Sequence, residues 1–251
     1  MYKRQELSYN LYLIIVGIFV LSVTNFIFPR MSRQTAGNDK AGLKHTVSAT
    51  MHTSLYVVIP MMAGLMLMAG QLVDFVYGGG EFDAFSIEIT SRALFFVSLG
   101  MIGYAIQAVI SRAFFAGQDG KTPLIAGVVS IVSNVVLCVL LVDKFDVSGL
   151  AIASAISSTI NAVILLIPLH RRGLSFADKP FCKDMAKVAA ATLLMSAAVM
   201  GTNGLLAHVT IPGPDKLYTF LKRREKYGIL LMPTLVATSL IFISPLRTYK
   251  Q

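Results

Sequence analysis

The residues of this sequence best suited to bind another molecule are concentrated in one short polar stretch. This stretch, residues 112–123, joins two long apolar runs at 93–110 and 124–142, and we call it the elbow. Arg112 and Lys121 place a cation on each side of glycines that allow the backbone to reverse. Cations at the water boundary of a membrane attract anionic lipid headgroups. We therefore predict a tight turn between two membrane helices, whose motif residues are Arg112, Asp119, Lys121, Thr122 and Pro123.

A second polar group lies inside the apolar runs and consists of amides and hydroxyls. Asn134 occupies the middle of one run, and the next run holds Ser154, Ser157, Ser158, Thr159 and Asn161 among many alanines. Two interpretations remain open for a cluster of Asn134, Ser154, Ser158 and Asn161. Small and hydroxylated residues allow close helix packing with hydrogen bonds across the contact. The same oxygens could instead form a weak cation site, although it would lack a carboxylate because Cys138 lies one turn beyond Asn134.

Charged residues are absent from the middle of every apolar run. Intramembrane charges usually mark proton relays, ion sites or grips on anionic substrates. The two cysteines, Cys138 and Cys182, have neither a disulfide pattern nor metal-ligand spacing. The sequence therefore predicts no metal centre and no cofactor.

Composition places the chain in a membrane. Of its 251 residues, 55% are hydrophobic and only 14% are charged, against about 25% charged in a soluble domain. The mean hydropathy is +0.69. The net charge of +9 does not indicate a nucleic-acid partner, because Lys and Arg collect in the loops between spans, as orientation in a bilayer requires.

The elements that must position these side chains are about seven membrane-spanning helices. Each apolar run is near the roughly 20 residues that a spanning helix needs, and a helix satisfies its own backbone polar groups in lipid. No small-residue cleavage site follows the N-terminal residues, so we expect the first run to remain as a span. The predicted spans are 9–28, 53–76, 91–115, 123–142, 148–169, 185–207 and 228–246.

The distribution of Lys and Arg predicts the orientation. If the loop after the first span is cytoplasmic, that side holds thirteen of the 22 basic residues, which favours a cytoplasmic C-terminus. The minority side holds Arg92, Lys144 and a basic segment at 216–226. That segment has the pattern of a short amphipathic helix lying on anionic headgroups.

The elbow sequence resembles the loop between the tenth and eleventh spans of the MurJ/MviN family, the bacterial lipid II flippases of the multidrug/oligosaccharidyl-lipid/polysaccharide exporter superfamily. The resemblance covers roughly residues 7 to 175. Residues 17–33 are similar to the family's eighth span with its Pro-x-x-Ser-basic exit, and residues 77–83 to an outer loop. Residues 133–137 and 149–154 resemble the next two spans, with Asn161 following.

The resemblance implies an all-α membrane bundle that forms the C-terminal half of a flippase and is not an enzyme. Residues 1–175 would be a bundle like the second lobe, and residues 176–251 two additional helices. The complete protein would move undecaprenyl-pyrophosphoryl disaccharide-pentapeptide across the bacterial cytoplasmic membrane by alternating access, for peptidoglycan synthesis. Its expected partners are this lipid-linked precursor, membrane lipids and an N-terminal half. Arg112 and Lys121 would lie at the cytoplasmic mouth; otherwise they are plain positive-inside anchors.

Two departures from the family pattern bear on substrate binding. Family members have about fourteen spans, and the first seven are absent here. Asn10 stands where the family has a cavity-facing Arg, and Gly79 replaces an outer-loop Arg. Asn cannot supply the bidentate charged grip that Arg gives a phosphate. Asn10 therefore remains a candidate substrate-binding residue, but it would hold a phosphate more weakly than Arg.

Two alternative functions remain open at this stage. The chain could belong to another exporter of the same superfamily, for a polysaccharide-linked lipid or a drug. It could also be a truncated or non-transporting half that needs a separately encoded N-terminal partner.

Overall fold

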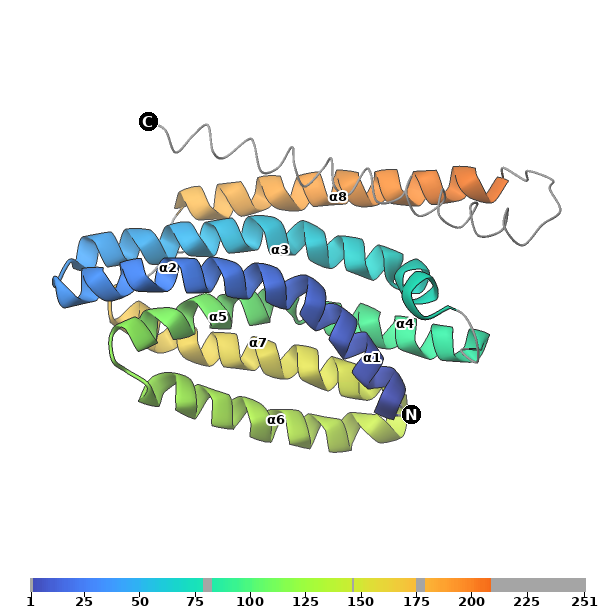
Figure 1. Ribbon diagram of the computed structural model, residues 1–251, viewed down its shortest axis with the longest axis horizontal. Helices are drawn as coiled ribbons and strands as arrows, with labels where there is room; N and C mark the ends of the chain where they lie inside the picture. The colour runs from blue at the N-terminus through green and yellow to red at the C-terminus, as the bar shows by residue number, and fades with distance from the viewer. Residues whose placement is uncertain (1, 79–82, 146, 175–178, 209–251) are drawn as a thin grey trace.

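The protein is a bundle of long helices, and its computed structural model describes residues 2–78, 83–145, 147–174 and 179–208. No strand occurs in these ranges. The helices lie side by side along one axis (Figure 1). They are α1 (Tyr2–Tyr12), α2 (Ile18–Ala36), α3 (Lys40–Tyr77), α4 (Ala84–Ser98), α5 (Met101–Ala116), α6 (Lys121–Phe145), α7 (Val147–Arg171) and α8 (Lys179–His208).

Four described helices are long and apolar enough to cross a membrane: α3, α6, α7 and the part of α8 from Lys183 to Gly201. They correspond to the predicted spans 53–76, 123–142, 148–169 and 185–207. The number rises to five if α4 and α5 together make one span. The predicted span 228–246 and the basic segment 216–226 lie outside the described residues. The all-helical membrane fold is confirmed.

The predicted span 91–115 is not one straight helix, because a bend of 45° divides it into α4 and α5, which together can form one broken span. At the break, the amides of Leu99 and Gly100 donate to carbonyls only three residues earlier, at 3.2 and 2.9 Å. This tightens the last turn of α4 and redirects the chain. Gly100 is required there, since a Cβ atom would lie 2.9 Å from the Cα of Ala155 on α7. The break therefore lets α5 approach α7 closely.

The first predicted span, 9–28, is helical throughout but irregular. A π-helical turn, Leu13–Gly17, separates α1 from α2. The helix also passes Pro29 and continues to Ala36, beyond the apolar run. The helix therefore contains the predicted span and extends beyond it.

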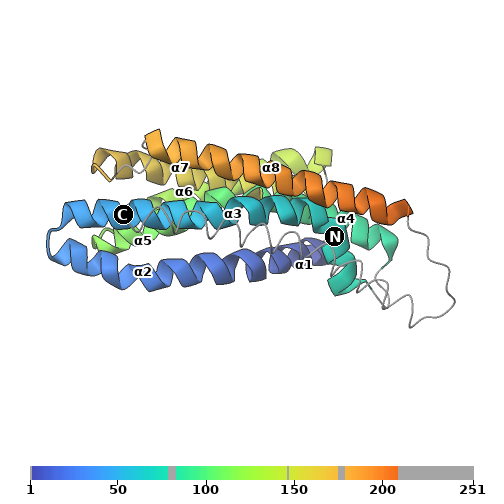
Figure 2. The same cartoon turned by 90° about the horizontal axis from the view of Figure 1, so that it is seen from above.

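The core lies between α1, the π-helical turn, α3, α4, α5 and α7, where Val16, Val58, Leu94 and Met101 are fully buried. α6 is at the edge of the bundle and packs mainly on α7 (Figure 1). Ala126 is its one buried residue in the described structure. α8 runs along α3, as both views show (Figures 1 and 2). The domain boundary near residue 175 stays a prediction.

The connections alternate between the two ends of the bundle. The α2–α3 turn, the elbow and the α7 terminus share one end (left in Figure 1). The start of α1, the end of α3 with the start of α4, and the end of α6 with the start of α7 share the other. The orientation predicted from the basic residues stays a prediction.

Candidate functional site

A polar groove of about 560 Å³ opens between α1, the α4–α5 break, α6 and α7. It collects the polar side chains that the apolar runs carry. They include Tyr9, Tyr12, Tyr104, Gln107, Ser130, Asn134, Ser154, Ser157, Ser158 and Asn161. All four members of the predicted polar cluster therefore line one surface.

Asn134 connects α6 to α7 within this groove. Its Nδ2 donates to the hydroxyl oxygen of Ser157 at 3.0 Å and lies 3.5 Å from that of Ser154. Ser130, one turn earlier on α6, donates to the carbonyl oxygen of Ser157 at 2.9 Å. The sequence analysis named Ser157 without including it in the predicted cluster, and Ser130 lies in the same apolar run as Asn134. Which of these serines meet across the contact depends on how α7 is rotated about its own axis relative to α6.

The hydroxyl protons of the groove are mostly used within α7. Ser154 donates to the carbonyl oxygen of Leu150 at 3.0 Å, and Ser157 has the carbonyl of Ser154 at 3.1 Å. The hydroxyl of Ser158 lies 2.9 Å from the carbonyl oxygen of Ala155. What remains available to a ligand is the lone pairs of these oxygens. The buried Oδ1 of Asn161 also has no hydrogen-bond partner in the described structure.

The groove is uncharged. No described Asp, Glu, Lys or Arg lines it, and the same residues hold no cluster of three His, Cys, Asp or Glu side chains. Cys138 directs its thiol at Oδ1 of Asn134, with a separation of 3.6 Å. The arrangement can accept a hydrogen-bond donor or a weakly held cation, and it also packs two helices together. Both predicted roles of the cluster remain open.

Irregular backbone borders the groove on two sides. Tyr12 precedes the π-helical turn, and Gly100 forms the α4–α5 break. The hydroxyl of Ser158 lies 3.2 Å from the carbonyl oxygen of Gly100, which accepts from the amide of Tyr104 at 2.9 Å, so α7 lies directly against the break. Irregular backbone at membrane depth is tolerated only where protein or a polar cavity covers it, and π turns often occur at functional sites. These breaks mark the groove as the candidate site within the span region.

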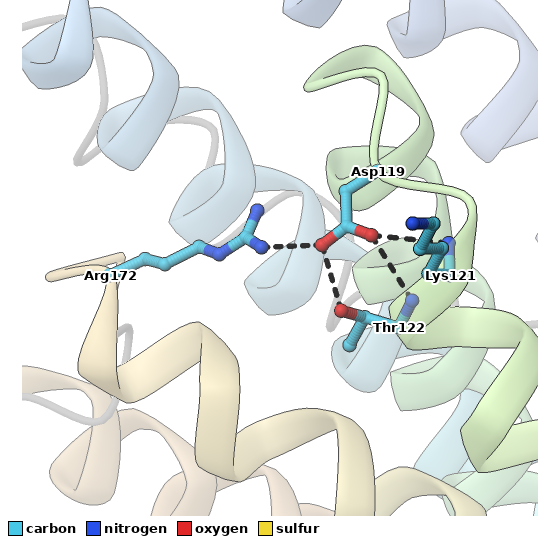
Figure 3. A network of polar contacts seen from close by, with 4 residues as sticks. All are labelled: Asp119, Lys121, Thr122 and Arg172. Carbon is cyan, nitrogen blue, oxygen red and sulfur yellow. Dashed lines mark hydrogen bonds and ion pairs between the residues drawn. The ribbon is translucent and has the colours of Figure 1, made fainter.

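The elbow is a second site, organised by Asp119 (Figure 3). Its Oδ1 accepts from the backbone amides of Lys121 and Thr122, both at 3.1 Å. Its Oδ2 accepts from the hydroxyl of Thr122 at 2.7 Å and forms an ion pair with Arg172. The hydrogen bonds from Thr122, its hydroxyl first and its amide second, lower the pKa of Asp119 to about 2, with Arg172 adding to the effect. Asp119 thus caps α6 and ties the elbow to α7.

The proposed substrate-binding residues do not form one cluster. Arg112 donates to Oδ1 of Asn25 on α2 at 2.8 Å and lies 5.9 Å from the ring centre of Phe28. Lys121 is exposed at the elbow. Asn10 is exposed on α1, whose end of the bundle is opposite the elbow. The structure brings Arg112 and Lys121 to the same end and separates both from Asn10.

Comparison with known proteins assigns the fold a family. Residues 6–219 match the family model described as lipid II flippase MurJ. A probable lipid II flippase MurJ from Vibrio cholerae is 28% identical over 185 residues, which cover 74% of this chain and 35% of the relative. A lipid II flippase MurJ from Thermosipho africanus is 30% identical over 185 residues, covering 73% and 36%.

A solved structure of lipid II flippase MurJ in an inward closed conformation has the same fold. It superposes with a TM-score of 0.77 at 24% identity, over 99% of this chain and 48% of the solved chain. The chain therefore spans about a third to a half of the length of these proteins, and corresponds to roughly their C-terminal half. It belongs to the MurJ lipid II flippase family.

Proposed function

We propose that this chain is the C-terminal part of a lipid II flippase that serves peptidoglycan synthesis. The observation that carries the proposal is the family match over residues 6–219, which includes the elbow, the groove and most of the described helices. In this function the chain moves a lipid-linked precursor and neither makes nor breaks a covalent bond. It works by alternating access, with an N-terminal half as the partner that completes the path.

The elbow end is assigned to the cytoplasm of a bacterial inner membrane. Exposed Arg30, Lys40, Lys44 and Arg171 lie at that end together with Lys121. Basic residues concentrate on the cytoplasmic side of membrane proteins, which supports this orientation and a cytoplasmic C-terminus. Arg112 and Lys121 then stand at the cytoplasmic mouth, where the anionic pyrophosphate of the substrate enters.

A non-transporting role as an isolated half is favoured by one specific observation. No charged side chain of the described residues lines the groove, and the exposed Asn10 is not part of its lining. A pyrophosphate needs cationic partners to leave water. The described residues hold none at the middle of the bundle, so the required charges must come from the N-terminal half.

Complementation tests both parts of the proposal. The 251-residue chain is expressed in flippase-depleted bacteria, alone or with the N-terminal half of a family relative, and growth and lipid II on the outer face are measured. The matched control is the relative's own two halves. Rescue by the pair but not by the single chain is expected, with lipid II retained on the inner face when the pair is absent. Rescue by the chain alone would refute the requirement for a partner.

An Arg112→Gln variant of the chain, expressed with the same partner, separates the flippase from a structural role. If Arg112 guides the pyrophosphate, the variant lowers outer-face lipid II at unchanged membrane abundance. If Arg112 only anchors the helix end, two results are possible. Either Arg112→Lys and Arg112→Gln both lower the amount of protein in the membrane, or both leave lipid II transport unchanged.

A further inference from the structure

Two basic residues share a pocket at the end of the bundle opposite the elbow. Arg92 lies on α4 and Lys144 in the last turn of α6, and both line a pocket of about 660 Å³. The distribution of basic residues had placed both on the minority side of the membrane. The fold brings them together from distant parts of the chain, with Phe95, Phe96 and Phe145.

The cations of this pocket keep donors available for an anion. Arg92 donates through one nitrogen to Glu88, one turn earlier, at 2.8 Å. The two side chains are 66% and 58% exposed, so this pair is weak. A guanidinium has five N–H donors, which leaves most of them free for a ligand. Lys144 is exposed and forms no ion pair with another described residue, although Asp143 precedes it on α6.

The rest of the pocket is apolar and aromatic. Phe95 and Phe96 meet edge to face, with ring centres 5.4 Å apart. Phe95 is 37% exposed and Phe145 is 53% exposed. Phe145 adjoins Lys144 in the last turn of α6, and long basic side chains near the ends of membrane helices extend towards the headgroups. This places the pocket at a membrane interface rather than in open water.

An apolar track leads from the pocket along α6. Leu140 and Val136 lie one and two turns before Lys144 on the same face, and they are 63% and 51% exposed. A molecule whose phosphate reaches Lys144 can therefore lay a hydrocarbon chain on this face. A soluble phosphate would leave the track and the rings unused.

We propose that this pocket binds the phosphodiester of an anionic membrane phospholipid. Arg92 and Lys144 hold the phosphate from α4 and α6, while Phe95 and Phe145 contact the first part of the acyl chains. Because α6 packs mainly on α7, the bound lipid bridges the edge helix to the rest of the bundle. The site is separate from the elbow and from the groove, and it does not depend on the flippase function.

Native mass spectrometry of the full 251-residue chain, released from detergent, tests the site. Phosphatidylglycerol is the probe, and diacylglycerol with the same tails is the control that lacks the phosphate. Arg92→Gln/Lys144→Gln is compared with Arg30→Gln/Lys44→Gln, which removes the same charge from exposed positions at the elbow end. We expect the pocket variant to bind phosphatidylglycerol about fivefold more weakly for each charge removed, and the control variant to bind normally. Diacylglycerol binding should be weak and equal in all three proteins.

Conservative variants and a soluble competitor complete the test. Arg92→Lys/Lys144→Arg should retain phosphatidylglycerol binding, which distinguishes loss of the site from loss of folding. Equal weakening in the pocket and control variants, or failure of the conservative variant to bind, would overturn the proposal. Displacement of the lipid by glycerol 3-phosphate at equal concentration would also overturn it, because the ligand would then be a soluble phosphate.

Discussion

Arg172, the residue after the end of α7, forms an ion pair with Asp119 in the elbow and also lies 4.8 Å from the ring centre of Phe114. The pair connects the α5–α6 turn to α7, two segments far apart in the sequence (Figure 3). Arg172 is 46% exposed in this pair and Asp119 only 19%. The carboxylate of Asp119 therefore belongs to a small network, in which Arg172 and the hydroxyl of Thr122 are its closest partners.

Asp119 should make the stability of the protein depend on acid pH. Its pKa is lowered to about 2 in the folded state, so the stabilisation is complete above the ordinary aspartate pKa of about 4. It is lost as the pH falls from about 4 to 2. Asp119→Asn should remove this part of the acid dependence. Because Asn caps a helix about as well as Asp, its cost at neutral pH, about 0.2–1 kcal/mol, should come from the lost ion pair with Arg172. Thermal unfolding followed by circular dichroism in detergent measures both effects.

Asp143→Asn is the matched control, since Asp143 is exposed on α6. Its carboxylate takes part in no network of described residues like the one around Asp119. It should retain the acid transition. An identical pH profile for wild-type protein and Asp119→Asn would contradict the assigned role of the network.

Gly103→Ala should destabilise the bundle by about 1–3 kcal/mol through overpacking. A Cβ atom at Gly103 would lie 2.9 Å from the backbone of Ser158 and Thr159 on α7. Gly201→Ala on α8 is the control, because a Cβ there meets no atom within 4 Å. That change should be neutral or stabilising, since alanine suits a helix better than glycine. Equal unfolding temperatures for the two variants would show that α5 and α7 are not closely packed.

Asn134→Leu distinguishes helix packing from a cation site in the groove. Loss of the hydrogen bonds to Ser157 and Ser154 should cost about 0.6–1.7 kcal/mol. Val135→Leu, on the exposed side of the same helix, should have little effect. If Asn134 serves packing alone, unfolding temperatures in sodium, potassium and choline salts fall by the same amount in the variant. A cation site instead predicts that a salt-specific stabilisation of the wild type disappears in Asn134→Leu.

Cysteine labelling tests the arrangement of the bundle ends. In a background with Cys138→Ser and Cys182→Ser, Asn38→Cys and Gln118→Cys should react with a membrane-impermeant maleimide from the same side. Asp143→Cys should react from the opposite side, because the α6–α7 connection lies at the other end of the bundle. Labelling of Asn38→Cys and Gln118→Cys from opposite sides would contradict the alternation of the loops.

Features that depend on one segment could be predicted from the sequence. α6 and α7 extend only a few residues beyond the predicted spans 123–142 and 148–169, because their apolar runs end at polar residues. The elbow was predicted for the same reason, since the glycines and Thr122-Pro123 act locally. Collection of the polar residues on facing helices was also predictable, because Asn and Ser avoid lipid.

Features that depend on distant segments were not predictable. The bend at Gly100 follows from close approach of Ala155 and Ser158 on α7, which no periodicity in α4 or α5 encodes. The same applies to the Arg172–Asp119 pair and to the selection of Ser157 by Asn134. These contacts are fixed only when the helices take their relative rotation and depth.

The length of α3 has a consequence for the shape that the protein presents to water. Its 38 residues measure about 57 Å at 1.5 Å per residue, whereas the hydrocarbon layer is only about 30 Å thick. Its apolar half lies towards Tyr77, so the end capped by Asp39 projects about 20 Å past the lipid tails. Together with α2 and the end of α5, with which Leu43 and Val47 share an apolar cluster, it forms a stiff post beyond the lipid tails. This post is a natural handle for an antibody fragment, which would give a small membrane protein the external mass that imaging requires.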